Sequence, residues 1–393
     1  MSSYLFSVYS NQKEFLYGEG AYLYDSEQKE YIDFTSGIGV NCLGHADEDI
    51  LNAINIQAQK LIHLSNLYLI QAQQECAEKI ANLSGFESMQ CFFCNSGAEA
   101  NEAAIKLVRK YAYMHQIKNH KIITLKNSFH GRTLTALKAT GQLEKHKGFE
   151  PLSEEFIYAN DIKDIYNKIT TETVAVMLEL VQGEGGINAW EKHEIQKLAY
   201  YLKQKEILLV VDEIQTGVYR IGEFLASNYY EIEPDVITLA KGLGGGLPIG
   251  VMMSNEKNIF TLGDHGSTFG GNPLCTYVAC RVLEKLDEIY RTQALKKTIH
   301  IFQNELVNCF RANQDIFSSY VGLGLMLGLK LSNKHILNQL LTISEQNGLL
   351  VLRSGSDIVR FLPPLNISKE EIRKGFERFQ TALNIIKENI YET

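Results

Sequence analysis

Six short, mainly apolar runs alternate with longer amphipathic stretches, and this alternation limits the folds that the chain can adopt. The runs are MQCFFC (89–94), KIITLK (121–126), VAVMLEL (174–180), ILLVVDEI (207–214), VITLA (236–240) and PIGVMMS (248–254). Strands that helices cover on both faces have this near-continuous apolar character. The middle of the chain is therefore predicted to be α/β with an open, mainly parallel sheet, and helices are expected at 98–113, 193–205 and 274–290.

The residues on either side of this block follow other patterns. Two aromatic-rich runs within 21–41 are joined by polar residues, which is typical of a hairpin. After the block, helical and apolar segments alternate up to a charged amphipathic stretch that ends near Tyr391. We expect an N-terminal segment (1–50) that contributes to a small domain, a large α/β domain (51–290) and a C-terminal small α+β domain (291–393).

Composition narrows the class of partner. The 393 residues are 45% hydrophobic and carry a net charge of −8 with both signs interspersed, which does not favour nucleic-acid binding. The first residues lack the pattern of a signal peptide, and no apolar run approaches the roughly 18 residues of a membrane span. We expect a cytoplasmic protein that binds small molecules or another protein chain, and neither nucleic acid nor a membrane.

Seven cysteines are scattered along the chain, and their odd number does not suggest a disulfide framework. Cys91 and Cys94 form a C-x-x-C pair, which in other contexts binds zinc or exchanges electrons. Here they fall in a predicted strand, where positions three apart point to opposite faces, and no second ligand pair follows. We expect core cysteines and no metal site.

Lys241 directly follows the run VITLA and precedes GLGGGLPIG. Its amine is expected at the carboxyl end of a strand, where open α/β sheets bind their ligands. A lysine at a strand end is by itself more often a solvated charge. The glycines do not form the fingerprint of a dinucleotide site, which argues against a nicotinamide dehydrogenase, and they let the backbone approach a ligand closely.

Asp212 ends the apolar run ILLVV, and a buried acid requires a cationic partner. A helix N-cap or a magnesium ligand would also explain this position. Together with Lys241, however, Asp212 suggests pyridoxal 5'-phosphate (PLP): the lysine would hold the aldehyde as an imine, and the acid would keep the pyridine nitrogen protonated. Gln215 is placed to reach the phenolic oxygen of the ring.

NSGAEANE (95–102) lies between a predicted strand and a predicted helix. Ser96, Gly97 and Ala98 would place free N–H groups and the positive end of the helix dipole against a phosphate. Thr268 in GSTFGGNP is a second candidate for the phosphate. A purely structural helix cap explains the first motif as well.

The motif NSFHGRT (127–133) supplies an aromatic ring and a guanidinium group. Phe129 is a candidate to stack on the cofactor ring, and Arg132 offers a planar fork for a carboxylate. Most arginines simply occupy surfaces, but Arg132 lies just beyond a predicted strand.

Six motifs occur in the order found in class III, or ω-, aminotransferases, and the chain resembles this family over nearly its whole length. They are NSGAEANE, SFHGRT, ELVQGEGG, VDEIQTG, LAKGLGGGLPIG and HGSTFGGNP. The resemblance implies the type I fold of PLP-dependent transferases, which is aspartate aminotransferase-like, with a seven-stranded sheet in the large domain. It also implies a homodimer with shared active sites.

The resemblance assigns a role to each candidate. It makes Lys241 the imine lysine and proton shuttle, Asp212 the partner of the pyridine nitrogen, Gln215 a contact of the phenolic oxygen, Phe129 a cover for one ring face, and Gly97 and Ala98 backbone ligands of the phosphate. Thr268 would reach the phosphate bound by the neighbouring subunit. Arg132 would bind the carboxylate farthest from the reacting amine.

Glu184 in QGEGG and Arg360 in IVRFLPPL match a pair that acts as a switch in the ornithine-type members. Glu184 would neutralise Arg360 while a donor reacts through its distal amine. Arg360 would be released when glutamate or 2-oxoglutarate brings its α-carboxylate.

Residues 36–45 and 64–68 most resemble the members of the class that act on acetylornithine. Ile38 stands where ornithine-specific members carry a tyrosine that holds a free α-amine. The expected reaction transfers the distal amine of N2-acetylornithine to 2-oxoglutarate, giving N-acetylglutamate semialdehyde and glutamate, as in arginine biosynthesis. Ornithine, succinylornithine, N-succinyl-diaminopimelate and 4-aminobutyrate stay open as donors.

Two other readings keep the scaffold and change the activity. A PLP aminomutase, racemase or decarboxylase needs no second substrate, so the pair of Glu184 and Arg360 favours transamination. A binding protein without catalysis has no use for a buried acid opposite a lysine, so Asp212, Lys241 and Arg132 together favour an enzyme.

Overall fold

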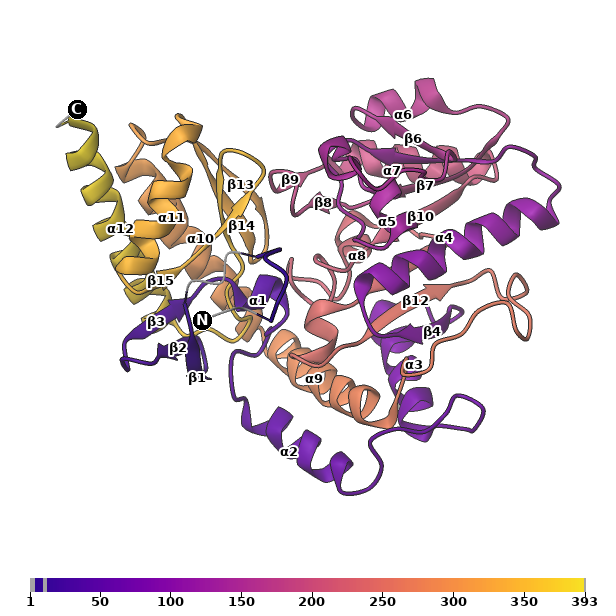
Figure 1. Cartoon of the computed structure of the whole chain (residues 1–393), viewed down its shortest axis with the longest axis horizontal. Coiled ribbons are helices and arrows are strands. Elements are labelled where there is room, and N and C mark those ends of the chain that lie inside the picture. The colour runs from indigo at the N-terminus through magenta and orange to yellow at the C-terminus, as the bar shows by residue number, and fades with distance from the viewer. Residues whose placement is uncertain (1–3, 10–12, 392–393) are drawn as a thin grey trace.

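Seven strands form one sheet in the computed structural model, which describes residues 4–9 and 13–391 (Figure 1). In order across the sheet they are β4 (Gln90–Cys94), β12 (Gly250–Ser254), β11 (Val236–Leu239), β10 (Leu208–Asp212), β7 (Thr173–Leu178), β5 (Lys121–Leu125) and β6 (Phe156–Ala159). β12 is antiparallel to both of its neighbours, and the other pairs are parallel. The expected mainly parallel sheet is confirmed.

Helices cover both faces of this sheet because successive strand residues point to opposite sides and both sides are apolar. In β10, Leu209 and Val211 pack in a cluster with α6 (Ile162–Lys168) and α7 (Lys192–Gln204). Leu208 and Val210 pack instead in a cluster with α4 (Gly97–Met114). The other elements of this part are α2 (Glu48–Ala58), α3 (Gln71–Ser84), α5 (Leu134–Ala139), η1 (Leu143–Lys145), β8 (Val181–Gln182), β9 (Asn188–Ala189), α8 (Ala226–Tyr230), η2 (Lys241–Gly244) and α9 (Pro273–Arg291).

Two details differ from the sequence expectation. β6 is not among the six predicted runs, because it has four residues and only its two end positions are buried. The run at 174–180 is not one strand, since β7 ends at Leu178 and β8 begins at Val181. Glu179 therefore lies at a strand end rather than inside a strand.

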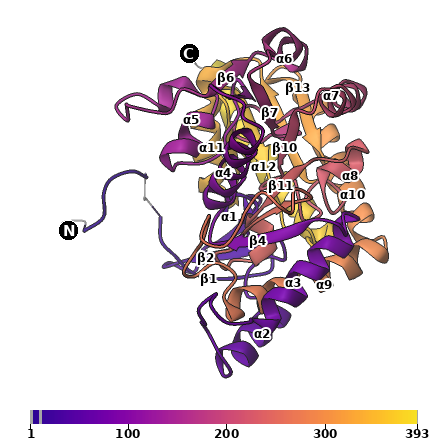
Figure 2. The ribbon, with the colours of Figure 1, turned by 90° about the vertical axis from the view of Figure 1, so that its right-hand side faces the viewer.

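The smaller part of the molecule joins the two ends of the chain (Figures 1 and 2). One sheet contains β1 (Phe15–Glu19), β2 (Tyr22–Asp25), β3 (Glu30–Asp33) and, parallel to β3, β15 (Leu349–Leu350). The other contains β13 (Phe317–Leu323), β14 (Met326–Leu331), β17 (Ile358–Phe361) and β16 (Leu352–Ser354). The helices are α1 (Ser36–Gly39), α10 (Ala294–Ala312), η3 (Lys334–Ile336), α11 (Leu337–Gln346) and α12 (Lys369–Tyr391). The β3–β15 pairing supports a shared small domain, while the boundaries at 50 and 290 stay a prediction.

The cysteines of β4 are free thiols, Cys91 half-buried and Cys94 buried. Burial raises the pKa of each thiol to about 12, so both are protonated in neutral solution, as core cysteines are. None of the helices in the described residues combines the length and the apolar character that a membrane span requires.

A cluster of aromatic rings fixes the N-terminal segment to the C-terminal part. Phe34, which follows β3 and is fully buried, lies 5.1 Å from Phe302 of α10, 6.3 Å from Phe361 of β17 and 5.8 Å from Phe376 of α12, between ring centroids. Edge-on and tilted ring pairs of this kind stabilise a core beyond the area that they bury.

We predict that Phe34→Ala lowers the free energy of unfolding by about 3–5 kcal/mol, because it leaves a cavity among three rings. Phe149→Ala is the matched control, since Phe149 is 56% exposed. Urea unfolding followed by circular dichroism measures both. Equal midpoints for the two variants would show that the cluster does not hold the segment.

Candidate active site

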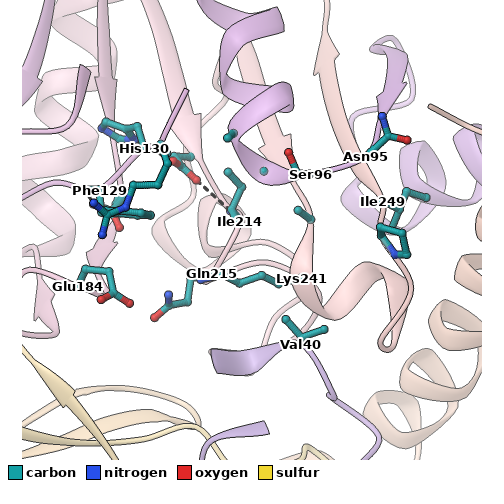
Figure 3. A pocket seen from close by; sticks show the side chains of 18 of the residues that line it. Val40, Asn95, Ser96, Phe129, His130, Glu184, Ile214, Gln215, Lys241 and Ile249 are labelled. Atoms are coloured by element: carbon teal, nitrogen blue, oxygen red, sulfur yellow. Dashed lines mark hydrogen bonds and ion pairs between the residues drawn. The ribbon is translucent and has the colours of Figure 1, made fainter. Parts of the chain in front are cut away.

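A cavity of about 420 Å³ opens at the carboxyl ends of β10 and β11, beside the start of α4 (Figure 3). Its volume is in the range of small-molecule sites. It is lined by Val40, Asn95, Ser96, Gly97, Ala98, Phe129, His130, Gly131, Arg132, Glu179, Glu184, Asp212, Ile214, Gln215, Ala240, Lys241, Gly246, Leu247, Pro248 and Ile249. Most of the residues singled out from the sequence thus face one cavity.

Lys241 lies two residues after the last residue of β11 and begins η2. Its backbone has φ 45°, a left-handed conformation that is uncommon outside glycine and that often marks functional sites. Burial lowers the pKa of the amine to about 8, and the positive charge of Arg360 acts in the same direction. A substantial neutral fraction near pH 7–8 makes Lys241 competent as a nucleophile and as a proton carrier.

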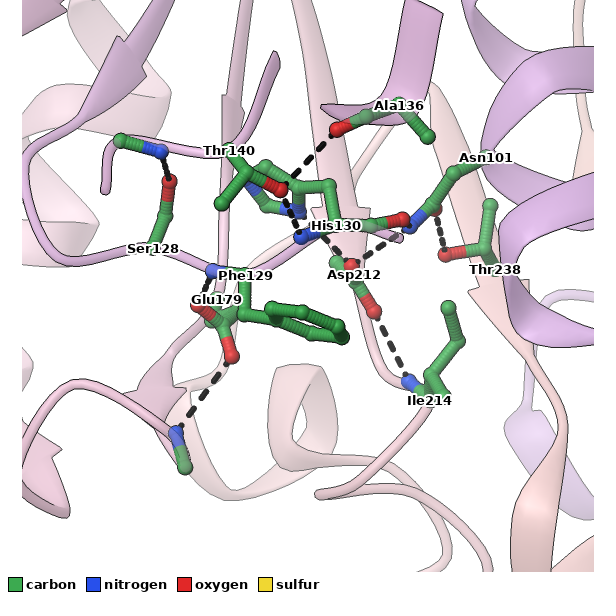
Figure 4. A network of polar contacts seen from close by, with 12 residues as sticks. Asn101, Ser128, Phe129, His130, Ala136, Thr140, Glu179, Asp212, Ile214 and Thr238 are labelled. Carbon is green, nitrogen blue, oxygen red and sulfur yellow. Dashed lines mark hydrogen bonds and ion pairs between the residues drawn. The ribbon is translucent and has the colours of Figure 1, made fainter. Parts of the chain in front are cut away.

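Asp212 is the last residue of β10 and is 3% exposed. Its Oδ2 accepts hydrogen bonds of 2.8 Å each from Asn101 Nδ2 and His130 Nδ1, and its Oδ1 accepts one of 3.1 Å from the Ile214 N–H (Figure 4). Asn101 also donates to the His130 carbonyl and accepts from Thr238 Oγ1. A carboxylate offers about four acceptor positions, so Oδ1 keeps one for a further donor.

His130 is the buried residue whose charged form Asp212 favours. Burial by itself lowers the pKa of the imidazole, but the hydrogen bond and the charge of Asp212 outweigh it and raise the pKa. The ring Nε2 is buried and has no hydrogen-bond partner among the described residues. Asp212 is therefore held by hydrogen-bond donors on both oxygens at the end of the cavity.

The start of α4 forms a cradle for an anion. Ser96 caps the helix, and its Oγ accepts the Glu99 N–H at 3.2 Å, while Glu99 Oε2 accepts the Asn95 N–H at 2.8 Å. The N–H groups of the first helical residues, Gly97 and Ala98, have no partner within the helix. A Cβ on Gly97 would lie 2.8 Å from the Ile214 side chain, so glycine allows the helix to begin this close to the cavity. Such a helix start binds phosphate.

Charged side chains surround the other side of the cavity. The Arg132 guanidinium carbon lies 5.4 Å from the centroid of the Phe129 ring. Arg360 of β17 is buried behind the lining, and its Nη1 donates to Glu184 Oε1 at 2.6 Å and to Gln215 Oε1 at 3.2 Å. Burial raises the pKa of Glu184, but the charge of Arg360 outweighs it, so the net shift is downward and the pair is ionised.

Three of the candidates lie outside the cavity lining: Arg360, which contacts Glu184 and Gln215 from behind it, and two exposed residues, Thr268 and Ile38. Thr268 is exposed in the connection between β12 and α9, and its expected contact is with a second chain, so its role stays a prediction. Ile38 in α1 is exposed as well and has a left-handed backbone conformation, while its near neighbour Val40 does line the cavity.

Three buried polar residues of the site are missing from the sequence-based set: Asn101, His130 and Glu179. All three lie inside the quoted motifs, but the contacts of Asn101 and His130 with Asp212 depend on how α4 packs against the sheet. Glu179 does carry a readable signal, because it ends an apolar run in the same way as Asp212 does.

The chain matches known proteins along nearly its whole length. The family profile described as "Aminotransferase class-III" matches residues 11–383. The chain belongs to the class III aminotransferases. It is a PLP-dependent transaminase with the type I fold, as its sequence motifs predict.

Several relatives in the class are named for ornithine derivatives. The chain is 49% identical to an acetylornithine aminotransferase of Wolinella succinogenes, over 96% of this chain and 97% of that one. It is 42% identical to a succinylornithine transaminase of Salmonella agona, over 93% and 90%. The crystal structure of N-acetylornithine aminotransferase from Stenotrophomonas maltophilia superposes with a TM-score of 0.84 at 34% identity, over 97% and 98%.

The cavity of this class III aminotransferase fits PLP on three counts. The free acceptor position of Asp212 suits a protonated ring nitrogen, the helix start at Gly97 suits a phosphate, and the amine of Lys241 suits an aldehyde. These three groups come from β10, α4 and the residues after β11, and they line one cavity.

We predict that Asp212→Asn weakens PLP binding roughly 10- to 100-fold, because a neutral amide replaces the carboxylate in a charge-assisted hydrogen bond. The dissociation constant can be measured by fluorescence titration of the cofactor-free protein with PLP. Asp161→Asn is the control, since Asp161 is an exposed helix cap, and asparagine also caps helices. An unchanged dissociation constant in Asp212→Asn would contradict the assignment.

Proposed function

We propose that this class III aminotransferase transfers the distal amine of N2-acetylornithine to 2-oxoglutarate, giving N-acetylglutamate semialdehyde and glutamate. The observation that carries the proposal is the ion pair of Glu184 and Arg360, 2.6 Å between Oε1 and Nη1, beside the amine of Lys241. An enzyme that takes two substrates of different shape in turn needs a cation that can be masked. The relatives named for acetylornithine support the choice of donor.

Each side chain has a defined task in this proposal. Bound PLP supplies the electron sink that stabilises negative charge on the donor carbon. Lys241 tethers the cofactor and, once released by the donor amine, moves the proton from the donor carbon. Asp212 keeps the ring nitrogen protonated, and Gln215 contacts the phenolic oxygen. Phe129 covers one face of the ring and limits access of water.

The donor is oriented from the far end of the cavity. Arg132 binds the α-carboxylate of acetylornithine, which lies at the opposite end of the molecule from the reacting amine. With this donor Arg360 has no carboxylate to bind, and Glu184 neutralises it. When 2-oxoglutarate enters, its α-carboxylate takes the place of Glu184 at Arg360.

A homodimer completes the proposed site. Leu67 and Leu69, at 89% and 82% exposed, lie in a connection between α2 and α3 that also holds Leu61 and Ile62 on the surface. Apolar surface of this extent favours contact with another chain. In the dimer Thr268 reaches the phosphate bound by the neighbouring subunit.

We propose the cytoplasm as the location of the enzyme.

Succinylornithine is the second candidate donor, because a transaminase named for it is 42% identical over most of both chains. It shares the α-carboxylate and the distal amine of acetylornithine and differs in its acyl group. Ile38, in place of a tyrosine that would hold a free α-amine, suits either acylated donor better than ornithine.

We predict that acetylornithine gives a kcat/KM at least roughly 10-fold above that of ornithine or 4-aminobutyrate. Ornithine brings a free α-amine for which the cavity has no partner, and 4-aminobutyrate is one carbon shorter and lacks the acylamino group. Glutamate formed from 2-oxoglutarate can be measured with acetylornithine, succinylornithine, ornithine and 4-aminobutyrate under one set of conditions. Faster turnover of an unacylated donor would contradict the proposed substrate.

We predict that Glu184→Gln shifts the balance between the two substrates. A neutral amide holds Arg360 less firmly, so KM for 2-oxoglutarate falls, and kcat/KM for acetylornithine falls roughly 10-fold because an unmasked cation faces the donor. Stopped-flow measurement of each half-reaction separates the effects. Glu144→Gln, an exposed position in η1, is the control. Equal changes in both half-reactions would contradict the switch.

A further inference from the structure

Glu179 is a buried acid of the cavity to which the reaction described above gives no task. It directly follows β7, is 6% exposed and lines the cavity. Val211 of β10 pairs with Leu178 of β7 in parallel register, so Asp212 and Glu179 are the next residues on neighbouring strands. Two carboxyl groups thus occupy equivalent positions at the same edge of the sheet (Figure 4).

The two oxygens of Glu179 connect two loops. Oε2 accepts the backbone N–H of Phe129 at 3.0 Å, and Oε1 accepts the backbone N–H of Gly183 at 3.4 Å. The first loop carries Phe129 and Arg132, and the second continues directly into Glu184. Neither hydrogen bond belongs to a helix or a strand. The side chain of Glu179 therefore provides the acceptors that hold these two loops together.

We propose that Glu179 is a positioning residue that, as a carboxylate, holds the loop of Phe129 and Arg132 and the loop of Glu184 in a fixed relation to each other. One side chain then fixes the positions of two groups: the residues that bind the far end of the donor and the residue that masks Arg360. This inference rests on the proposed function for the roles of Arg132 and Glu184.

The ionised form does this better than the protonated form. Two N–H donors require two acceptor oxygens, whereas a protonated carboxyl turns one oxygen into a hydroxyl that is a poorer acceptor for the N–H it faces. A buried carboxylate that accepts two backbone hydrogen bonds is consistent with a negative charge at this position.

The charged groups that face Glu179 are His130 from the loop after β5, Asp212 from β10 and, across the cavity, Lys241 after β11. Burial raises the pKa of Glu179 to about 7, and the charge of Asp212 adds to the rise, while His130 and the two N–H groups oppose it. Near neutral pH the carboxyl of the cofactor-free protein is therefore partly protonated. A cationic ring nitrogen arriving beside Asp212 lowers this pKa, and the proton leaves as the cofactor binds.

Three variants separate position from charge. Glu179→Gln keeps the size but replaces one acceptor oxygen with an NH₂ group, which meets a backbone N–H. Glu179→Asp keeps the charge but is too short to reach both loops. Glu191→Gln removes an exposed acid twelve residues further along and serves as the matched control.

The first measurement is calorimetric and needs no amine donor. PLP is titrated into the cofactor-free full chain at pH 7 in two buffers of different ionisation enthalpy, which gives the number of protons released. Wild type and Glu191→Gln are expected to release about half a proton more per chain than Glu179→Gln, since a group with a pKa near 7 is half protonated at that pH. The charge of Glu179 also raises the pKa of Lys241, so the titration is repeated at pH 6, where the amine is protonated in every variant and the difference reports mainly on residue 179. An equal proton count in wild type and Glu179→Gln would contradict the loss of a proton from Glu179 as the cofactor binds.

The second measurement uses the PLP-loaded protein and the donor that wild type turns over best. Glu179→Gln and Glu179→Asp are expected to raise KM roughly 10-fold for both the donor and 2-oxoglutarate, because both loops lose their common support. A fall in kcat with both KM values unchanged would overturn the positioning role. If wild type rejects acetylornithine and turns over another donor, the proposed substrate fails, while the calorimetric difference and the paired KM changes still decide on Glu179.

Discussion

The buried carboxylate of Asp212 is the group on which the rest of the site depends. An ion at this depth costs several kcal/mol unless charged and hydrogen-bonding partners surround it. His130 supplies the opposite charge, Asn101 a second donor, and Thr238 fixes Asn101 in turn. These partners come from a loop, a helix and a neighbouring strand. All the partners of this acid are in place only when the sheet and α4 are correctly assembled, and this network gives the cavity a rigid polar end.

The parallel sheet then places the remaining groups. Asp212 of β10 pairs with Thr238 of β11, and Lys241 follows three residues later, beyond the same edge. The fold thus brings an acid and an amine that are far apart in the sequence to the same cavity. The smaller part of the molecule adds Arg360 from β17, which reaches Glu184 on the opposite side. The ring cluster around Phe34 keeps that part in place.

Features that depend on local pattern could be predicted from the sequence. Apolar runs ended by Asp212 and Lys241, a glycine-rich helix start at Gly97, and the order of the six motifs lead to the fold, the family and the cofactor. Features that depend on how distant parts of the chain pack together could not be predicted from the sequence. His130 and Asn101 become visible as partners of Asp212 only when the loop after β5 and α4 are packed together.

Glu179 shows the limit most clearly. Its run reads as one continuous strand, whereas in the structure β7 ends one residue earlier and turns the acid into the cavity. β6 escapes the sequence pattern because two of its four side chains are only half-buried. The expected contact of Thr268 depends on a second subunit, so its role stays a prediction.

The central claim is that Lys241 and Asp212 hold the two reactive ends of one bound ring. Its most direct test is to load the protein with PLP, reduce it with borohydride, digest it and locate the phosphopyridoxyl group by mass spectrometry. The account predicts a single modified lysine, Lys241. Modification of another lysine, or a label spread evenly over the surface lysines, would contradict it.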